Sequence, residues 1–427
     1  MSRVVVIGAG AMGLAAAYHA LKAGHQVEVL EAAPEPGGMA AHFDFGGLSI
    51  ERFYHFICKA DEGTFALLDE LGLRDKLRWR TTSMGYFIDG KLYDWGNPLA
   101  LLRFPRISLL ARLRYGLLAF VSVRRERWDA LEQQTVQEWV RRWGGAEVWD
   151  RLWKPLLGLK FHEYADNISA AWIWTRVKRI GRSRKSLFEE QLGYLEGGSQ
   201  TLVDALAKAI ADAGGTIRLL TPAERVMTEG GRVTGVATPQ GTVPADAVIS
   251  TMPTPFVSAT VPDLPADWRA KYDAIHNIGV CCLLFKLKRQ VTPHFWVNIV
   301  DPDIEIPGII EFSNLRPLDH TVVFVPYYMP VTHPKFSWTS EQLLGEAFSY
   351  LQRVNPALTQ DDIIDSYVAR LRHAQPVCEP GFAAKLPPVQ TPIQGLQIAD
   401  TCFYYPEDRG ISESVRIARE MAQRIPA

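Results

Sequence analysis

The sequence predicts an α/β fold in which a parallel-sheet domain is interrupted by a second domain of α+β type. The first observation is a strand, a glycine-rich turn, a helix and a second strand within residues 4–38. The second is that short apolar strands and helices return at 194–251 and 391–427, while the intervening segments are rich in aromatic residues. We therefore predict two discontinuous domains, one of residues 1–75, 194–251 and 391–427 and the other of residues 76–193 and 252–390.

The first element is an apolar run, Val4 to Ile7, that leads into a turn reading Gly8-Ala9-Gly10-Ala11-Met12-Gly13. In this pattern the first glycine permits a tight turn, the second lets the backbone approach a pyrophosphate, and the third lets helix and strand pack closely. The amides and the positive dipole at the start of the following helix attract phosphates. We expect this turn to bind the pyrophosphate of a dinucleotide through Gly8, Gly10, Ala11, Met12 and Gly13.

The second strand, Val27 to Leu30, ends at an acid, Glu31, with seventeen residues between this acid and Gly13. A carboxylate at this place accepts hydrogen bonds from an adenosine ribose, and Ala32 lies beside it. A second glycine turn, Gly37-Gly38 followed by Met39, comes shortly after. The simpler alternative is an NAD-binding unit in which this glycine pair is an ordinary loop.

The blocks at 194–251 and 391–427 also contain expected helices and short apolar strands. Leu202, Leu206 and Ile210 share one face of an expected helix that a glycine pair ends. The expected elements are a helix at 201–213, strands at 216–220, 224–228, 232–238, 247–251 and 396–400, and a closing helix at 412–424.

Together the three blocks resemble the FAD-dependent superfamily that contains protoporphyrinogen oxidase, phytoene desaturase, monoamine oxidase and UDP-galactopyranose mutase. The resemblance rests on the N-terminal turn, on Gly197-Gly198 followed by Leu202 and Gly214-Gly215, and on the segment around Asp400. It implies a glutathione-reductase-type FAD-binding Rossmann domain with a discontinuous α+β substrate domain. It also implies FAD as the cofactor.

By the same resemblance, Asp400 is expected to bind the ribityl or pyrophosphate part of FAD. Gly410, Ile411 and Ser412 are expected to present backbone amides to the isoalloxazine, and the backbone of Val226 is expected to contact adenine. The alternatives are that Asp400 caps a strand end, that Ser412 caps the closing helix and that Val226 is a core residue.

Three residues are candidates for a catalytic role. Arg52 and His55 belong to the segment that runs beside the flavin in the family, and Arg409 precedes the closing helix. For His55 alone, a structural hydrogen bond is an equally good interpretation. Hydride transfer depends more on orientation than on a strong acid or base.

Composition limits the classes of function and location. A net charge of −1 argues against a general nucleic-acid binder, and the sequence indicates no metal site. Five cysteines without CxxC spacing indicate reduced, buried thiols in the cytoplasm. The first strand begins close to Met1, so we expect no signal peptide. The longest uncharged candidate, Tyr115 to Val123, is too short to cross a membrane.

Two basic segments stand out in the predicted substrate domain. Residues 98–127 interleave leucines with seven arginines and one glutamate. This pattern suits a helix lying on an anionic membrane surface, such as the inner face of the cell membrane, or a helical hairpin packed on the protein. Residues 176–185 hold six basic residues, suited to a phosphate, a diphosphate or lipid headgroups, or to a solvated loop. Lys154 and Lys160 are further candidates to line the cleft.

The predicted function is that of an FAD-dependent oxidoreductase, an oxidase or dehydrogenase resembling protoporphyrinogen oxidase and the amine oxidases. It would take a hydride from a largely apolar small molecule, with or without a phosphate group. By the same resemblance an amine substrate is less expected. Amine oxidases usually place an aromatic residue in the loop just before the closing helix, and Arg409 to Ser412 contains none. The main alternative is a flavin-dependent sugar isomerase resembling UDP-galactopyranose mutase, with no net redox change. A non-catalytic flavoprotein is the third alternative.

Overall fold

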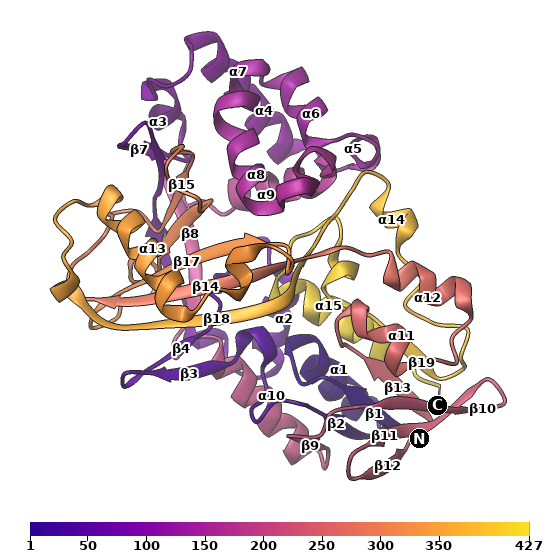
Figure 1. The fold of residues 1–427 in the computed structure, drawn as a ribbon. Coiled ribbons are helices and arrows are strands. Elements are labelled where there is room, and N and C mark those ends of the chain that lie inside the picture. Colours follow the sequence, from indigo (N-terminus) through magenta and orange to yellow (C-terminus); the bar gives the residue numbers. More distant parts are fainter. Residues whose placement is uncertain (427) are drawn as a thin grey trace.

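The computed structural model describes residues 1–426. Figure 1 shows a sheet beside both chain termini, a second sheet of long strands across the middle, and a group of helices, α3 to α9, at the opposite end. The chain passes repeatedly between these parts.

Five strands form a parallel sheet with the order β19-β13-β1-β2-β9. They are β1 (Arg3–Ile7), β2 (Gln26–Leu30), β9 (Thr216–Arg218), β13 (Ala247–Ser250) and β19 (Leu396–Ile398). Every residue of β13 and β19 is buried, as expected for strands covered on both faces. Since parallel strands end at one edge, the turn after β1, Glu31 after β2 and Asp400 after β19 come to the same edge.

Helices cover one face of this sheet and a small antiparallel sheet covers the other. The helices are α1 (Ala11–Lys22), α10 (Gln200–Asp212), α15 (Ile411–Gln423) and, against α15, α2 (Glu62–Glu70). The small sheet consists of β10 (Arg225–Glu229), β11 (Arg232–Thr238) and β12 (Gly241–Pro244). Its apolar side chains pack with those of α11 (Val257–Thr260) and α12 (Ala266–Asp273). Residues 257–273, placed in the substrate domain by the sequence, therefore pack beside the parallel sheet.

The middle sheet has seven strands in the order β18-β14-β17-β16-β15-β6-β7. Its strands are β6 (Met84–Ile88), β7 (Lys91–Trp95), β14 (Asn277–Leu287), β15 (Trp296–Ile299), β16 (Gly308–Glu311), β17 (Thr321–Met329) and β18 (Ile363–Pro376). Only the β15–β6 pair is parallel. α13 (Ser340–Val354) packs its apolar side on one face through Leu343, Phe348 and Leu351. The other face belongs to the core shared with the helical group.

The helical group at the end of the molecule packs around buried tryptophans, including Trp149, Trp172 and Trp174. Its elements are α3 (Pro98–Arg103), α4 (Leu109–Arg124), α5 (Asp129–Glu132), α6 (Val136–Trp143), α7 (Ala146–Val148), a π-helical turn (Trp149–Trp153), α8 (Lys154–Phe161), η4 (His162–Asn167) and α9 (Ala170–Arg182). Among the described residues, none of the helices combines the length and the apolar character needed to cross a membrane.

Short elements connect these parts. They are the hairpin β3 (His42–Phe45) and β4 (Leu48–Glu51), the pair β5 (Leu77–Thr82) and β8 (Glu190–Leu195), α14 (Phe382–Lys385), and the 3-10 turns η1 (Gly38–Ala40), η2 (Arg74–Lys76), η5 (Thr254–Phe256), η6 (Phe312–Asn314), η7 (Pro334–Ser337), η8 (Gln360–Asp362) and η9 (Thr401–Tyr404).

Most expected elements form within one or two residues of their predicted limits. The closing helix, expected at 412–424, is α15. The strand expected at 216–220 ends at Arg218, because Leu220 takes a positive φ of 51° that no extended strand contains. The leucine and arginine segment of residues 98–127 forms two helices, α3 and α4, separated at Pro105.

Candidate functional site

A cavity of about 770 Å³ lies where the carboxyl edge of the parallel sheet meets the seven-stranded sheet. Its wall takes residues from distant parts of the sequence, including the β1–α1 turn, the segment after β4, α9, β14, β17 and the start of α15. Among the residues expected at the site, the wall includes Gly8, Gly10, Ala11, Met12, Glu31, Ala32, Gly37, Gly38, Met39, His55, Asp400, Arg409, Gly410 and Ile411.

The turn after β1 has the geometry that its glycines predict. Gly8 takes a φ of 96°, which favours glycine. A Cβ added to Gly10 would meet no atom of the protein within 4 Å, so the space beside this residue is open. A Cβ on Gly13 would lie 1.8 Å from the carbonyl oxygen of Gly8. Gly13 is therefore needed for close packing of α1 on the turn and does not itself line the cavity.

The second glycine turn lies directly against the first. The Gly37 amide donates a hydrogen bond of 2.7 Å to the Ala9 carbonyl, and Gly37 has a φ of 116°. A Cβ on Gly38 would lie 3.2 Å from the Cα of Gly10. Two segments of backbone thus approach each other where side chains would keep them apart.

The Glu31 carboxylate is fixed at the end of β2 by two backbone amides. Its Oε2 accepts a hydrogen bond of 2.7 Å from Ala9, and its Oε1 accepts one of 2.8 Å from Ala33. An ionised carboxylate has about four acceptor positions, so two remain for hydroxyl groups in the cavity.

The Asp400 carboxylate also binds two amides, those of Thr254 at 2.7 Å and Cys402 at 2.9 Å. Burial raises its pKa, against the effect of these hydrogen bonds. Asp400 thus caps η9 and joins it to η5, and it also lines the cavity. Gly410 is the N-cap of α15, so the free amides of this helix begin at the cavity wall.

Three other expected residues do not line the cavity. The Ser412 hydroxyl accepts a hydrogen bond of 3.1 Å from the Gly63 amide and so joins α15 to α2. Val226 is fully buried in β10. The guanidinium of Arg52 lies 5.5 Å from the centroid of the Phe43 ring. Arg52 follows Glu51, the last residue of β4, and lies in the bend after this strand, beside two residues that do line the cavity, Glu51 and Phe53.

Glu51 is a buried acid that the sequence did not single out. Its Oε1 lies 3.4 Å from the His42 ring and accepts a hydrogen bond of 3.1 Å from the Ser199 amide. Burial would raise the pKa of this carboxyl, but the hydrogen bond and charge of His42 hold it at about 2. His55, close by, has a pKa lowered by burial, and its Nδ1 has no hydrogen-bond partner within residues 1–426.

Apolar and aromatic side chains from the segment after β4 and from the seven-stranded sheet form another part of the cavity wall. They are Tyr54, Val280, Trp296, Phe312, Tyr328 and Leu371. The Tyr54 ring packs edge-on against Trp296, with 5.6 Å between ring centroids. Side chains of this kind commonly line the sites at which proteins bind small molecules.

Lys160, from the end of α8, brings an amine to this wall. Its Nζ lies 4.7 Å from the centroid of the Tyr328 ring and 4.9 Å from that of Trp172. Burial lowers the pKa of this amine well below its usual range, and Arg176 lowers it further, although Asp408 opposes them. This amine therefore gives up its proton more readily than an ordinary lysine, and a nearby anion would oppose that loss.

Two arginines beside Lys160 keep their charge. Arg176 forms an ion pair with Asp408, whose pKa is held at about 2 despite burial because of Arg176 and Lys160. Arg409 donates to the Ala374 carbonyl and, over 3.3 Å, to the Tyr328 hydroxyl. Within residues 1–426, Nε of Arg409 and Oδ1 of Asp408 are buried without a hydrogen-bond partner. One hydrogen-bond donor, Nε of Arg409, and one acceptor, Oδ1 of Asp408, are thus available to a ligand.

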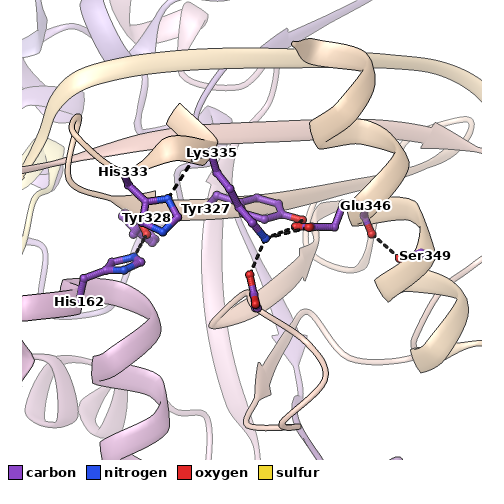
Figure 2. A network of polar contacts seen from close by, with 8 residues as sticks. His162, Tyr327, Tyr328, His333, Lys335, Glu346 and Ser349 are labelled. Carbon is purple, nitrogen blue, oxygen red and sulfur yellow. Dashed lines mark hydrogen bonds and ion pairs between the residues drawn. The ribbon is translucent and has the colours of Figure 1, made fainter. Parts of the chain in front are cut away.

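A network of polar contacts holds the strand that carries Tyr328 (Figure 2). The His162 ring, just after α8, lies 2.8 Å from the Tyr328 carbonyl and 5.0 Å from the His333 ring. On the neighbouring residue, the Tyr327 hydroxyl donates to Glu346 over 3.1 Å, and Lys335 binds the same carboxylate at 2.7 Å. The helix bearing Lys160 and the strand bearing Tyr328 are therefore fixed to each other.

Comparison with known proteins assigns this arrangement to a family. Residues 13–400 match the model of the flavin containing amine oxidoreductases. The chain belongs to this family. This assignment confirms the resemblance seen in the sequence, and a flavin, FAD, is the cofactor of the chain.

Individual relatives of this flavin containing amine oxidoreductase are distant. A phytoene dehydrogenase of Streptomyces griseus is 27% identical over 307 residues, which are 63% of this chain and 56% of the relative. The chain thus spans about half the length of that relative.

Solved structures show the same fold over nearly the whole chain. A putative protoporphyrinogen oxidase from Exiguobacterium has a TM-score of 0.75 at 21% identity and covers 99% of this chain and 98% of its own. A reduced UDP-galactopyranose mutase has a TM-score of 0.76 at 16% identity, and the match covers 99% of this chain and 93% of the mutase chain. At these identities the likeness extends to the mixed α/β fold alone.

The site of this family member suits the cofactor. The open space beside Gly10, the paired glycine turns and the α15 amides offer room and donors for FAD along one edge of the sheet. All five cysteines are free and buried, as the sequence predicted.

The second basic segment divides between two environments. Arg176 and Arg179, three residues apart on α9, line the cavity, and Arg179 binds Asp61 through two hydrogen bonds of 2.9 and 2.7 Å. Lys178 and Arg182 instead pair with Glu126 outside it. Residues three or four apart share one side of a helix, so the spacing in the sequence already groups Arg176 with Arg179 and Lys178 with Arg182. Lys154 is exposed and does not line the cavity, unlike Lys160.

Proposed function

We propose that this protein is an FAD-dependent oxidase or dehydrogenase that takes a hydride from a largely apolar substrate carrying an anionic group. The observation that carries the proposal is a cavity wall on which Tyr54, Trp296 and Phe312 share the space with Lys160, Arg176 and Arg409. Bound FAD supplies the hydride acceptor.

The cofactor is assigned to the carboxyl edge of the parallel sheet. Gly10, Ala11 and Met12 would hold the pyrophosphate, and Glu31 the adenosine ribose. Gly410 and Ile411 would give backbone amides to the isoalloxazine end, where the positive end of the α15 dipole favours negative charge. In this arrangement residues 1–75, 194–251 and 391–426 form the FAD-binding Rossmann domain together with residues 257–273, and the remaining described segments form the substrate domain.

The aromatic wall would orient the substrate. The Tyr54 ring is restrained by packing against Trp296, and the Tyr328 hydroxyl is held by the hydrogen bond from Arg409. A rigid apolar slot excludes water and limits the positions that a bound molecule can take. His55 is assigned a positioning role beside Glu51, and Arg52 is given no role because it lies off the wall.

The charges favour an anion over an amine as the polar end of the substrate. Around Lys160, Arg176 and Arg409 carry two positive charges against the one negative charge of Asp408, which disfavours an ammonium group at this part of the wall. A carboxylate or phosphate would instead pair with Arg409 and draw a proton onto Lys160. The sugar isomerase alternative is not retained, because only the fold links this chain to the mutase and the family match favours an oxidoreductase.

The test is anaerobic titration of the purified yellow protein with fractionated host extract, followed by the visible flavin absorbance. We expect one apolar, acidic fraction to bleach the flavin. The Arg409→Met variant should need at least about tenfold more of that fraction, because a charged hydrogen bond is lost. No bleaching by any fraction, with normal reduction by dithionite, would overturn the proposed oxidation. Bleaching by a basic fraction would overturn the anionic substrate alone.

A further inference from the structure

Large apolar side chains that remain exposed are concentrated at one end of the molecule. Nine of the fourteen such residues in the described chain belong to α3, α4 or the loop after α9. They are Leu99, Leu102, Leu109, Leu110, Leu113, Leu117, Phe120, Leu187 and Phe188. We refer to these nine residues as the α3–α4 face. Figure 1 places α3 and α4 in the helical group, at the opposite end from the chain termini.

The orientation of α4 explains this concentration. Leu110, Leu113, Leu117 and Phe120 follow one another at helical spacing and are between 50% and 66% exposed. The side of α4 that packs on the protein is buried at Ala111, Leu118 and Ser122. A surface helix normally turns its large apolar residues inward. Exposed apolar patches of this extent mark binding surfaces.

The neighbouring segments extend the same surface. Leu99 and Leu102 on α3 are 45% and 47% exposed. The loop that carries Leu187 and Phe188 is held beside the start of α3, because Arg184 donates a hydrogen bond to the Gly96 carbonyl. The far end of α4 is held to α9, since the Arg182 side chain donates to the Val123 carbonyl over 3.2 Å.

Arginines without acidic partners accompany the apolar residues. Arg124 lies over the Phe120 ring, 3.6 Å from its centroid, at the spacing of the exposed side of α4. Arg112 and Arg114 donate to backbone carbonyls, those of Leu102 at 2.7 Å and Trp143 at 3.0 Å. Within residues 1–426, no carboxylate forms an ion pair with Arg103, Arg112, Arg114, Arg124 or Arg125. The positive charge of this region is therefore not neutralised locally.

We propose that the α3–α4 face binds an anionic lipid bilayer. Its leucines and Phe120 would enter the boundary between headgroups and acyl chains, and the arginines would bind the phosphates. A second copy of the chain fits less well, because a two-fold contact would bring the unneutralised arginines of the two copies together. The proposal does not depend on the substrate or on the reaction.

The test is co-sedimentation of the FAD-loaded protein with vesicles of phosphatidylcholine, alone or with a quarter of phosphatidylglycerol. We expect binding to the anionic vesicles and little to the neutral ones. Leu113→Glu/Leu117→Glu should weaken binding at least about tenfold, since two apolar groups are lost and two negative charges added. Arg124→Glu should weaken it about fivefold or more, and less at high salt.

The matched control is Leu219→Glu/Leu220→Glu, two leucines exposed just after β9 on the parallel sheet. This variant should bind like the wild type, and all variants should keep the flavin absorbance and circular dichroism of the wild type. Equal binding of the wild type to both vesicle types, or unchanged binding of Leu113→Glu/Leu117→Glu, would overturn the proposal. A dimer in sedimentation velocity that this variant converts to a monomer would also overturn it and identify a second copy as the partner.

Discussion

The amine of Lys160 lies 4.7 Å from the centroid of the Tyr328 ring, at the junction of the helical group and the seven-stranded sheet. The ring faces of Tyr328 and Trp172 surround this amine on a wall that also carries two charged arginines. Because burial lowers the pKa of this amine, its protonation depends on the charges around it.

Lys160→Met should stabilise the substrate-free protein near neutral pH. Because burial lowers the folded-state pKa of the amine, the unfolded chain binds more protons between that pKa and the usual 10.5. The wild type therefore gains stability as pH rises through this window, and the variant does not. We expect thermal unfolding to show the variant more stable by roughly 1 kcal/mol at pH about 7, with the difference shrinking toward pH about 10. The control is Lys154→Met, on the exposed side of α8, which should leave the stability unchanged. A Lys160→Met variant less stable than the wild type would contradict the lowered pKa of Lys160.

Gly10→Val should abolish FAD binding while leaving the fold intact. A side chain at Gly10 meets no protein atom but enters the space assigned to the pyrophosphate. The ratio of flavin to protein absorbance should fall to nearly zero, with the far-ultraviolet circular dichroism retained. Gly345→Ala, where α13 also has open space, is the control that keeps the flavin. Full flavin content in Gly10→Val would contradict the position assigned to the cofactor.

Asp61→Asn should destabilise the protein by about 3 kcal/mol, because it leaves the Arg179 guanidinium partly buried without its ionic partner. Urea unfolding of the FAD-loaded protein measures the loss. The control is Asp129→Asn, which removes an exposed ion pair with Arg127 and should cost less than about 0.5 kcal/mol. Similar losses in the two variants would show that burial adds nothing to the Arg179–Asp61 pair.

Glu311→Gln should remove a loss of stability that develops as pH rises from about 4.5 to about 8. Burial raises the pKa of this carboxyl to about 8, although the amides of Val291 and Thr292 donate to it. The folded chain thus holds a proton that the unfolded chain releases near pH 4.5, and wild-type stability falls as pH rises from there to about 8. Glutamine resembles the protonated form, so at pH about 8 the variant should be more stable by on the order of 3 kcal/mol. Parallel unfolding curves from pH about 5 to about 8 would contradict this.

The cofactor end of the site was largely predictable because its signals are local in the sequence. Gly8, Gly10 and Gly13 act through one turn, and Glu31 follows from the length of a single strand–helix–strand unit. Each needs only the chain around it to take its place.

The substrate end was predictable only in part. Lys160, Arg409 and the basic segment 176–185 were candidates from the sequence, but Tyr328 and Asp408 were not, because this end of the cavity is built from distant segments. Lys160, Tyr328 and Asp408 come from a helix, a strand and a loop that meet only after the sheets assemble. Arg52 lies in the bend after β4, where its guanidinium is 5.5 Å from the centroid of the Phe43 ring, whereas its neighbour Glu51 lines the cavity. The helical period of α9 places Arg176 on the side that faces the cavity. Lys178, two residues further on, lies on another side and pairs with Glu126.

The wall of the cavity begins with the β1–α1 turn and ends with α15, at the two ends of the chain. During synthesis on the ribosome, the first glycine turn emerges long before β19 and α15, which lie beside it in the folded protein. The cavity therefore cannot close around a flavin until β19 and α15 have been made. A nascent chain stalled before β19 would be left with an open, unfilled sheet edge.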